Sequence, residues 1–403
     1  MEKTKYLIIG NGIAGLSAAR EIRNHDKAGD ITIVSSEPYL TYYRPRLSEG
    51  IYKDFNIENI LVYDESWYRE RNIKTILRVI VEKIDLANRL AYLDDARIIE
   101  YEKLLIATGS RPFIPPIKGK YKEGVFALRT FKGLNDFKKY LRSCNTVTVI
   151  GGGLLGLEAA WSLKLLGKKV NVIEFAPYLL PRQLDKELAN ELEKQLDSQG
   201  INTYTNSQVE EILGDERANG VKLNGDRELP TDAILISSGV RPNLDLIRDT
   251  GIEFDKGIKV DVHMRTNMEN VYAAGDVVEI EGMILGLWTA GNEQGKIAGA
   301  NMVGVEMVYN QPKIITKLEM GDIKVFSAGI INNYDTIYEY QDSSKGVHHK
   351  IFVKEGLIYG AILFGDLKDM VKINKAVTLR LPVEELIKDL NIKVTSKALN
   401  NEI

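Results

Sequence analysis

KYLIIGNGIAG (residues 5–15) and TVTVIGGGLLG (residues 146–156) are two copies of one pattern, and they decide the fold. In each copy a short apolar run meets clustered glycines, and an apolar helical pattern follows. A second apolar run then ends in an acid, at Glu37 in the first copy and at Glu174 in the second. A strand, a glycine turn, a helix and a second strand form a βαβ unit, so the sequence predicts an α/β protein that uses this unit twice.

The glycines indicate phosphate-binding turns. They form two sets of identical spacing: Gly10, Gly12 and Gly15, and Gly151, Gly153 and Gly156. Without side chains, backbone N–H groups can approach a pyrophosphate, which the positive end of the next helix also favours. Glu37 and Glu174 lie where a carboxylate can hold a ribose hydroxyl pair. One such set alone also fits an ordinary tight turn with a surface glutamate, but two sets with terminal acids favour two dinucleotide sites.

The composition excludes several classes of protein. The 403 residues exceed one typical domain, and a net charge of −3 gives no footprint for nucleic acid or acidic lipid. No apolar run has the length of a membrane span. The single cysteine, Cys144, rules out an internal disulfide and is interpreted as a structural thiol, and we expect no metal site. His348 and His349 are predicted to be surface residues. We therefore expect a cytoplasmic, multidomain protein.

Five motifs in a fixed order resemble the FAD- and pyridine-nucleotide-dependent reductases with two dinucleotide-binding domains. They are GNGIAG (10–15), IATGSRP (106–112), GGGLLGLE (151–158), SSGVRPN (237–243) and AAGDV (273–277). The resemblance implies two Rossmann-like domains of the glutathione-reductase type and a small C-terminal α+β domain. The FAD-binding domain would comprise residues 1–110 and 240–308, the NAD-binding domain residues 111–239, and the C-terminal domain residues 309–403. Alternating apolar patterns after residue 310 also predict antiparallel hairpins there.

The resemblance implies a set of residues that bind FAD: Gly10, Gly12, Ala14, Gly15, Glu37, Arg44, Pro45, Ala107, Thr108, Gly109, Gly275, Asp276, Trp288 and Thr289. Within it, Glu37 would hold the adenosine ribose and Asp276 the ribityl chain. Trp288 would lie beside the flavin, at the start of a helix whose positive end stabilises a reduced flavin. An ordinary core role for Trp288 stays open.

A second implied set binds NAD: Gly151, Gly153, Leu155, Gly156, Glu174 and Gly239. The Glu174 carboxylate would repel a 2′-phosphate, which favours NADH, while Arg182 nearby keeps NADPH as the alternative. Glu158 matches a family glutamate near the flavin, although a solvated helix position explains it equally well. The predicted catalytic residues are Arg44, Glu158 and Trp288.

The segment PYLTYYRPRLSEG (38–50) holds no cysteine. Disulfide reductases of this superfamily carry a redox cysteine in this region, so its absence implies that the flavin passes electrons directly to an acceptor. The segment resembles that of reductases serving small iron proteins. In its sequence motifs the chain is most similar to NADH:rubredoxin reductases. We therefore expect electrons to pass from NADH through FAD to rubredoxin or a similar carrier. Ferredoxin reduction, oxygen reduction by an NADH oxidase, and a nucleotide-sensing role that docks a partner are the alternatives.

The resemblance fails at Glu49, where several ferredoxin reductases have a lysine beside the flavin. Arg44 or Arg46 is a candidate for the compensating charge. Arg44, Arg46 and Lys53 also form a basic cluster that could attract an acidic carrier, although scattered surface charge explains them equally well. The oligomeric state stays open.

Overall fold

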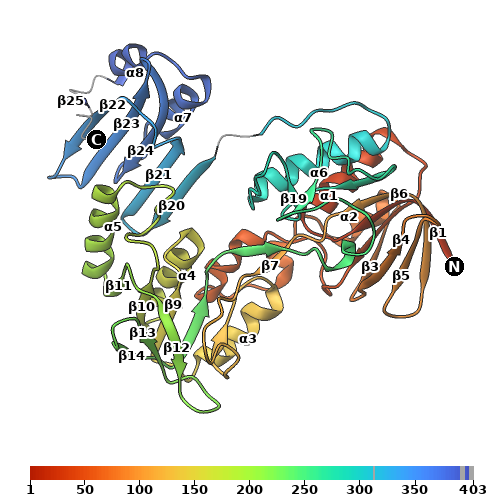
Figure 1. Ribbon diagram of the computed structural model, residues 1–403, viewed down its shortest axis with the longest axis horizontal. Coiled ribbons are helices and arrows are strands. Elements are labelled where there is room, and N and C mark those ends of the chain that lie inside the picture. Colours follow the sequence, from red (N-terminus) through yellow and green to blue (C-terminus); the bar gives the residue numbers. More distant parts are fainter. Residues whose placement is uncertain (312–313, 391–394, 399–403) are drawn as a thin grey trace. The chain divides into compact units, whose positions relative to one another are not determined.

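Each glycine turn lies in its own unit of the chain (Figure 1). The computed structural model describes residues 1–311, 314–390 and 395–398. The first unit comprises Met1–Phe113, Arg129–Phe131 and Gly239–Pro312, and the second comprises Ile114–Leu128, Lys132–Ser238 and Lys313–Ile403. The predicted fold class, with two Rossmann-like folds and a C-terminal α+β region, is confirmed. The boundaries of three separate domains stay a prediction.

A seven-stranded sheet forms the centre of the first unit, in the order β3-β2-β1-β6-β5-β4 with β18 also paired to β6. Its strands are β1 (Glu2–Ile9), β2 (Ile31–Ser35), β3 (Ile73–Leu77), β4 (Val81–Asp85), β5 (Leu90–Leu93), β6 (Ile98–Ile106) and β18 (Val271–Ala273). Strands β3, β2, β1, β6 and β18 run parallel, whereas β4 and β5 add an antiparallel hairpin. The carboxyl ends of the parallel strands therefore meet at one edge, where the glycine turn lies.

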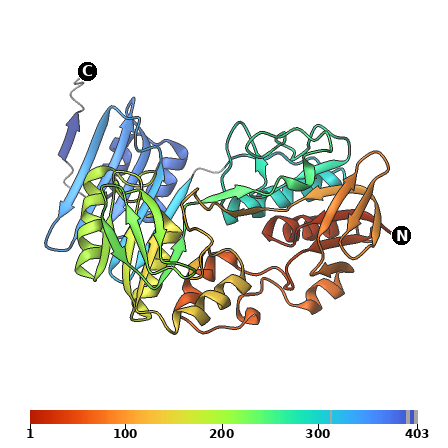
Figure 2. The ribbon, with the colours of Figure 1, turned by 60° about the horizontal axis from the view of Figure 1, so that its bottom comes forward.

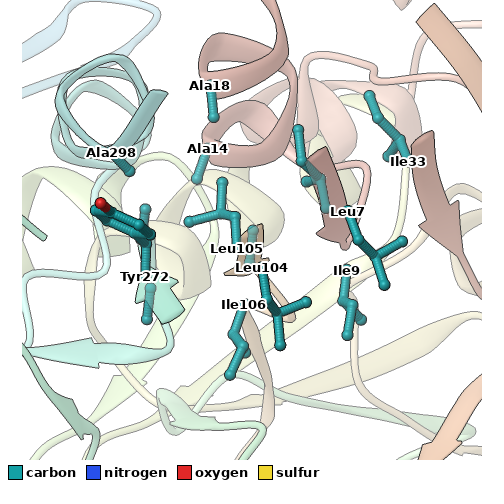
Figure 3. Close-up of a cluster of buried hydrophobic side chains, with 14 of the residues drawn as sticks. Leu7, Ile9, Ala14, Ala18, Ile33, Leu104, Leu105, Ile106, Tyr272 and Ala298 are labelled. Carbon is teal, nitrogen blue, oxygen red and sulfur yellow. The ribbon is translucent and has the colours of Figure 1, made fainter. Parts of the chain in front are cut away.

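Short elements and three helices complete the first unit. The helices are α1 (Ile13–His25), α2 (Glu65–Glu70) and α6 (Trp288–Met302). The 3-10 turns are η1 (Arg44–Leu47), η2 (Glu49–Ile51), η3 (Ile57–Ile60) and η4 (Asp245–Ile247), and the short strands are β7 (Ser110–Pro112), β16 (Val240–Pro242), β17 (Ile258–Lys259) and β19 (Val278–Glu279). The core lies between the sheet and the pair α1 and α6, and side chains from all three meet in it (Figure 3).

The second unit contains a parallel sheet in the order β11-β10-β9-β15-β8. Its strands are β8 (Val125–Phe126), β9 (Thr146–Ile150), β10 (Lys169–Ile173), β11 (Ile201–Tyr204) and β15 (Ala233–Ile236), and the helices around it are α3 (Phe131–Leu141), α4 (Leu154–Leu165) and α5 (Lys186–Ser198). A small antiparallel sheet follows, with β12 (Val209–Leu213), β13 (Gly220–Leu223) and β14 (Glu228–Pro230). The second glycine turn joins β9 to α4.

A six-stranded antiparallel sheet forms the C-terminal part of the second unit, in blue in Figure 2. In spatial order its strands are β20 (Ile315–Met320), β21 (Ile323–Gly329), β24 (Leu357–Phe364), β23 (Val347–Lys354), β22 (Thr336–Asp342) and β25 (Thr395–Ala398). Two helices, α7 (Met370–Leu379) and α8 (Val383–Leu390), lie between β24 and β25 in the chain. The predicted hairpin turn between β23 and β24 is confirmed. Glu355 and Gly356 both have positive φ, which suits a two-residue turn between twisted strands.

The prediction that His348 and His349 are surface residues is wrong. Their relative exposures are 1% and 6%. They lie in β23, which pairs on both sides with β22 and β24, and seven of its eight residues are buried. The polar residues of this strand suggested a surface position, whereas the strand is internal to the sheet. Cys144 is also buried, and this burial raises the pKa of its thiol.

Helices α1 and α6 pack with their backbones in close contact, side by side in Figure 1. Gly291, Gly295 and Gly299 recur every four residues and so lie on one face of α6. A Cβ at Gly295 would lie 2.1 Å from the Ala14 carbonyl oxygen, and one at Gly299 would lie 2.5 Å from that of Ala18. Glycine is therefore needed at these positions for the helices to approach.

In the described residues no helix is long and apolar enough to cross a membrane.

The substitution Gly295→Ala is expected to destabilise the protein by about 1–3 kcal/mol, because the added methyl group overlaps a backbone carbonyl and forces the helices apart. Denaturant unfolding of the apoprotein measures this change. Lys296→Ala, in the same turn of α6 but only partly buried, is the control and should change the free energy of unfolding by less than about 0.5 kcal/mol. Equal stability of the two variants would contradict this account of the packing.

Candidate functional site

The glycines of the first turn have two different functions. A Cβ at Gly10 would lie 2.1 Å from the Ala107 carbonyl oxygen, and one at Gly15 would lie 2.0 Å from the Gly10 oxygen. These two glycines therefore allow β1, α1 and the end of β6 to approach. Gly12 differs, since its φ of −86° suits any residue and an added Cβ would meet no protein atom within 4 Å. Its missing side chain leaves open space at the N-terminus of α1.

The second turn repeats this division. A Cβ at Gly151 would lie 2.4 Å from the Ser237 carbonyl oxygen, and one at Gly156 would lie 1.9 Å from the Gly151 oxygen. Gly153 has a φ of −79° and again faces open space. Neither α1 nor α4 has a side-chain cap on its first N–H groups. Both turns therefore present free helix N-termini beside open space, which fits the pyrophosphate of a dinucleotide.

The acid after the first turn is held by its neighbours. Glu37 accepts a hydrogen bond from the Tyr42 hydroxyl at 2.7 Å and another from Arg44 Nη2 at 2.8 Å. Arg44 is largely buried, and its Nη1 also donates to the Arg129 carbonyl oxygen at 2.6 Å. Burial lowers the pKa of Arg44, but the neighbouring Tyr42 and Glu37 outweigh this effect and keep it above its usual value. Because a carboxylate accepts about four hydrogen bonds, Glu37 can still accept from ribose hydroxyls.

The cysteine-free segment is attached to the glycine turn. Thr41 Oγ1 donates to Asn11 Oδ1 at 2.8 Å, and Tyr42 forms an isolated β-bridge with Leu61. Pro45 lies exposed within η1. Burial raises the pKa of Tyr42, which therefore stays a neutral hydrogen-bond donor to Glu37. The cysteine-free segment is thus attached beside the first glycine turn by hydrogen bonds.

Asp276 lies in a network that the sequence did not reveal. Its Oδ2 accepts from Arg129 Nη2 at 2.7 Å and from Ser110 Oγ at 2.9 Å. Arg129 Nε also donates to the Ser110 carbonyl oxygen at 3.1 Å. Arg129 was not among the predicted residues because it comes from a three-residue segment, Arg129–Phe131, that carries no recognisable pattern. The preceding Gly275 has a φ of +88° and donates its N–H to Gln294 in α6.

The segments 107–112 and 239–243 lie side by side. Strands β7 and β16 pair antiparallel, and Asn243 Nδ2 donates to the Thr108 carbonyl oxygen at 2.8 Å. Gly109 and Gly239 have positive φ and face open space. The structure therefore brings the motifs IATGSRP and SSGVRPN together.

The remaining predicted residues of the first unit lie around the start of α6. Trp288 is its first residue and stacks on Tyr43, with ring centroids 5.5 Å apart. Thr289 is exposed, whereas Ala14 is buried against Gly275. Ala14 thus has a packing role in the structure. Trp288 and Arg44 belong to the first unit.

Glu158 and Leu155 belong to α4 of the second unit. Glu158 is partly buried, and Leu155 is exposed in the first turn of the helix. The acid after the second turn, Glu174, accepts from the Gly152 N–H at 2.6 Å and from the Ala176 N–H at 2.8 Å. Its carboxylate is therefore held against the glycine turn, while Arg182 is exposed. This arrangement disfavours a 2′-phosphate and suits NADH.

The predicted basic cluster is largely neutralised. Arg46 Nε pairs with Glu49 at 2.9 Å, and Lys53 pairs with the same carboxylate. Arg44 pairs with Glu37 and is only partly exposed. Arg46, Lys53 and Glu49 together carry one net positive charge. Hydrogen bonds from Lys53 and Arg46 lower the pKa of Glu49 despite its partial burial. That Arg44 or Arg46 supplies the charge of the missing lysine stays a prediction.

Among the described residues one group of three side chains has the spacing of metal ligands. Glu187, Glu339 and His348 place ligand atoms within 4.8 Å of one another. The Lys350 ammonium lies 2.6 Å from Glu187 Oε2 and 3.6 Å from Glu339 Oε1. The lysine thus already supplies a cation to these carboxylates.

Comparison with known protein families gives a match that includes both glycine turns. The family model "Pyridine nucleotide-disulphide oxidoreductase" matches residues 4–295, and "Rubredoxin NAD+ reductase C-terminal domain" matches residues 315–380. A nitrite reductase [NAD(P)H] of Bacillus subtilis is 35% identical over 96% of the chain, which spans about half of that protein. The NADH-rubredoxin oxidoreductase of Clostridium acetobutylicum is 35% identical over 94% of the chain and 95% of its own length.

The chain is also similar to a solved structure of a rubredoxin oxidoreductase. The crystal structure of the NADH:rubredoxin oxidoreductase from Clostridium acetobutylicum matches with a TM-score of 0.82 and 33% identity, covering 96% of this chain and 100% of that one. The two family models together extend over both glycine turns and most of the C-terminal sheet. This chain belongs to the pyridine nucleotide-disulphide oxidoreductase family.

Proposed function

We propose that the chain is an FAD-dependent NADH reductase that passes electrons to rubredoxin or a similar one-electron iron protein. The observation that carries the proposal is the pair of open glycines, Gly12 and Gly153, each at a free helix N-terminus in a different unit. The absence of cysteine from residues 38–50 supports a protein acceptor in place of a disulfide. The similarity to an NADH-rubredoxin oxidoreductase over nearly its whole length supports rubredoxin.

The first unit supplies the residues that would hold FAD. The N–H groups at the start of α1 would bind its pyrophosphate, and Glu37 would accept from its adenosine ribose. Arg44 neutralises Glu37 and fixes its orientation. Asp276, oriented by Arg129 and Ser110, would accept from the ribityl hydroxyls. When bound, FAD supplies the chemistry that accepts a hydride and donates single electrons.

The second unit supplies the residues that would hold NADH. The start of α4 would bind the pyrophosphate, and Glu174 would accept from the ribose hydroxyls. We propose that Arg44, Glu158 and Trp288 orient and tune the reacting groups, since the hydride step requires no general acid or base. We also propose a cytoplasmic location, because the only cysteine is a buried free thiol.

Mixing the NADH-reduced protein with different acceptors tests the function. Anaerobic reduction by NADH, followed by stopped-flow mixing with rubredoxin, ferredoxin or oxygen, should show the fastest reoxidation with rubredoxin. Reoxidation by oxygen at the same rate as by any carrier protein would replace the proposal with an NADH oxidase. Negligible NADH:dye reductase activity of FAD-loaded protein would favour the sensing alternative.

The open glycines predict two separable losses. Gly12→Ala should weaken FAD binding on the order of ten-fold or more, because the methyl group occupies the space beside the helix N-terminus, whereas the stability of the apoprotein should change by less than about 1 kcal/mol. Gly153→Ala should instead raise the KM for NADH and leave FAD binding unchanged. FAD titration of the apoprotein and steady-state kinetics measure the two effects, and each variant is the control for the other. A loss of FAD from both variants would contradict two separate sites.

Arg129→Met should raise the Kd for FAD on the order of ten-fold, because it leaves the Asp276 carboxylate without its cation. Fluorescence titration of apoprotein with FAD measures this change. Arg111→Met removes a cation that pairs with Asp245 on the exposed surface of the same unit and should have little effect. If both variants bind FAD as tightly as the parent, Arg129 has no part in the site.

A further inference from the structure

A buried lysine in the C-terminal sheet joins this sheet to α5. Lys350, in β23, has a side-chain exposure of 4%. Its Nζ donates to Asp185 Oδ2 at 2.7 Å and to Glu187 Oε2 at 2.6 Å. Burial lowers the pKa of Lys350, but these two hydrogen bonds outweigh it, so the group stays protonated at neutral pH. A buried charge of this kind is fixed in position by its partners.

His348 makes a second link from the same strand to the same helix. Its Nδ1 lies 2.8 Å from Glu191 Oε1, and its Nε2 lies 2.6 Å from Glu339 Oε1 in β22. Glu187 and Glu191 are four residues apart and therefore lie on one face of α5. That face is thus attached to the C-terminal sheet at two successive turns.

Asp185 has a second function at the start of α5. Its Oδ2 receives Lys350, while its Oδ1 accepts from the Leu188 N–H at 3.0 Å and caps the helix. The residue has the extended backbone typical of an N-cap. One carboxylate therefore joins the C-terminal sheet to the first turn of α5 and fixes where the helix begins.

The segment just before Asp185 packs on the second glycine turn. The Leu184 N–H donates to the Leu180 carbonyl oxygen at 2.9 Å, and the Leu180 N–H donates to the Gly152 oxygen at 3.4 Å. A Cβ at Gly152 would lie 2.4 Å from Leu179 Cδ2, so Leu179 presses on this glycine. Leu179, Leu180 and Leu184 are almost completely buried.

Two observations indicate that the segment 179–184 connects Asp185 to the second glycine turn. Leu180 has a φ of +51°, a conformation that a leucine adopts only when its surroundings enforce it. Gly152, against which the segment packs, donates the N–H that orients Glu174. A continuous set of contacts thus runs from Lys350 through Asp185 and the 179–184 segment to the acid of the second glycine turn.

We propose that Lys350 is a positioning residue for the NADH site: it holds Asp185, and through it the 179–184 segment, against Gly152 and Glu174. The inference rests on the proposed function in assigning NADH to this turn. It gives the C-terminal sheet a role in binding the nucleotide, in addition to any role toward an electron acceptor.

The test compares Lys350→Met with the parent as full-length, FAD-loaded protein. The KM for NADH and the Kd for NAD⁺ from calorimetric titration should rise on the order of ten-fold, while the kcat for dye reduction and the FAD content stay the same. Lys317→Met is the matched control, because Lys317 lies in the same sheet and pairs with Glu319 on the exposed surface. This control should leave the KM, the Kd and the FAD content unchanged.

A lower melting temperature of Lys350→Met with an unchanged KM and Kd would overturn the proposal, since it would mean a purely structural role. If Lys350→Met does not fold, Asp185→Asn replaces it, because asparagine keeps the helix cap but removes the charge that Lys350 holds. An unchanged KM and Kd in this variant would overturn the proposal equally. A parent protein that binds NAD⁺ but does not reduce a dye would refute the proposed function, and the NAD⁺ titration would still decide the role of Lys350.

Discussion

The contact of main chain with main chain at glycine is the constraint on which both nucleotide folds depend. Gly10 lies against Ala107, and Gly151 lies against Ser237, at distances that leave no room for a methyl group. In each fold this contact lets the chain turn directly from the first strand into the helix. The helix N-terminus then stands at the carboxyl edge of the sheet, and the acid of the next strand stands beside it. Close packing and ligand binding are thus consequences of the same turn.

The charges of the first site follow a second rule, since its acids are paired with arginines. Glu37 is paired with Arg44, and Asp276 is paired with Arg129. A dinucleotide brings two negative phosphates into this region, so unpaired carboxylates would repel the ligand that they are meant to orient. Arginine suits this role because its planar group can hold a carboxylate and a backbone carbonyl at once, as Arg44 does.

Local patterns predicted most of the fold, because strand and helix periods, glycine turns and the Glu355–Gly356 hairpin are properties of neighbouring residues. The glycine spacing also located both candidate sites. Arg129 escaped prediction because its partner, Asp276, is distant in sequence and no local pattern connects them. The burial of His348 escaped for the same reason, since its partners lie on α5 and β22. Polar residues in an internal strand become understandable only once the fold brings their partners to them.

The three residues Arg129–Phe131 limit which segments of the chain can be exchanged with those of a relative. They belong to the first unit although the residues on both sides belong to the second, so six segments alternate and the chain passes between the units five times. Exchange of the whole stretch between Phe113 and Gly239 with that of a relative would also exchange the arginine that orients Asp276. Recombination at these natural boundaries therefore preserves the first site only if the incoming stretch carries an arginine at the same place. The two units fold around separate sheets, but the sequence of one cannot be exchanged without changing a residue of the other.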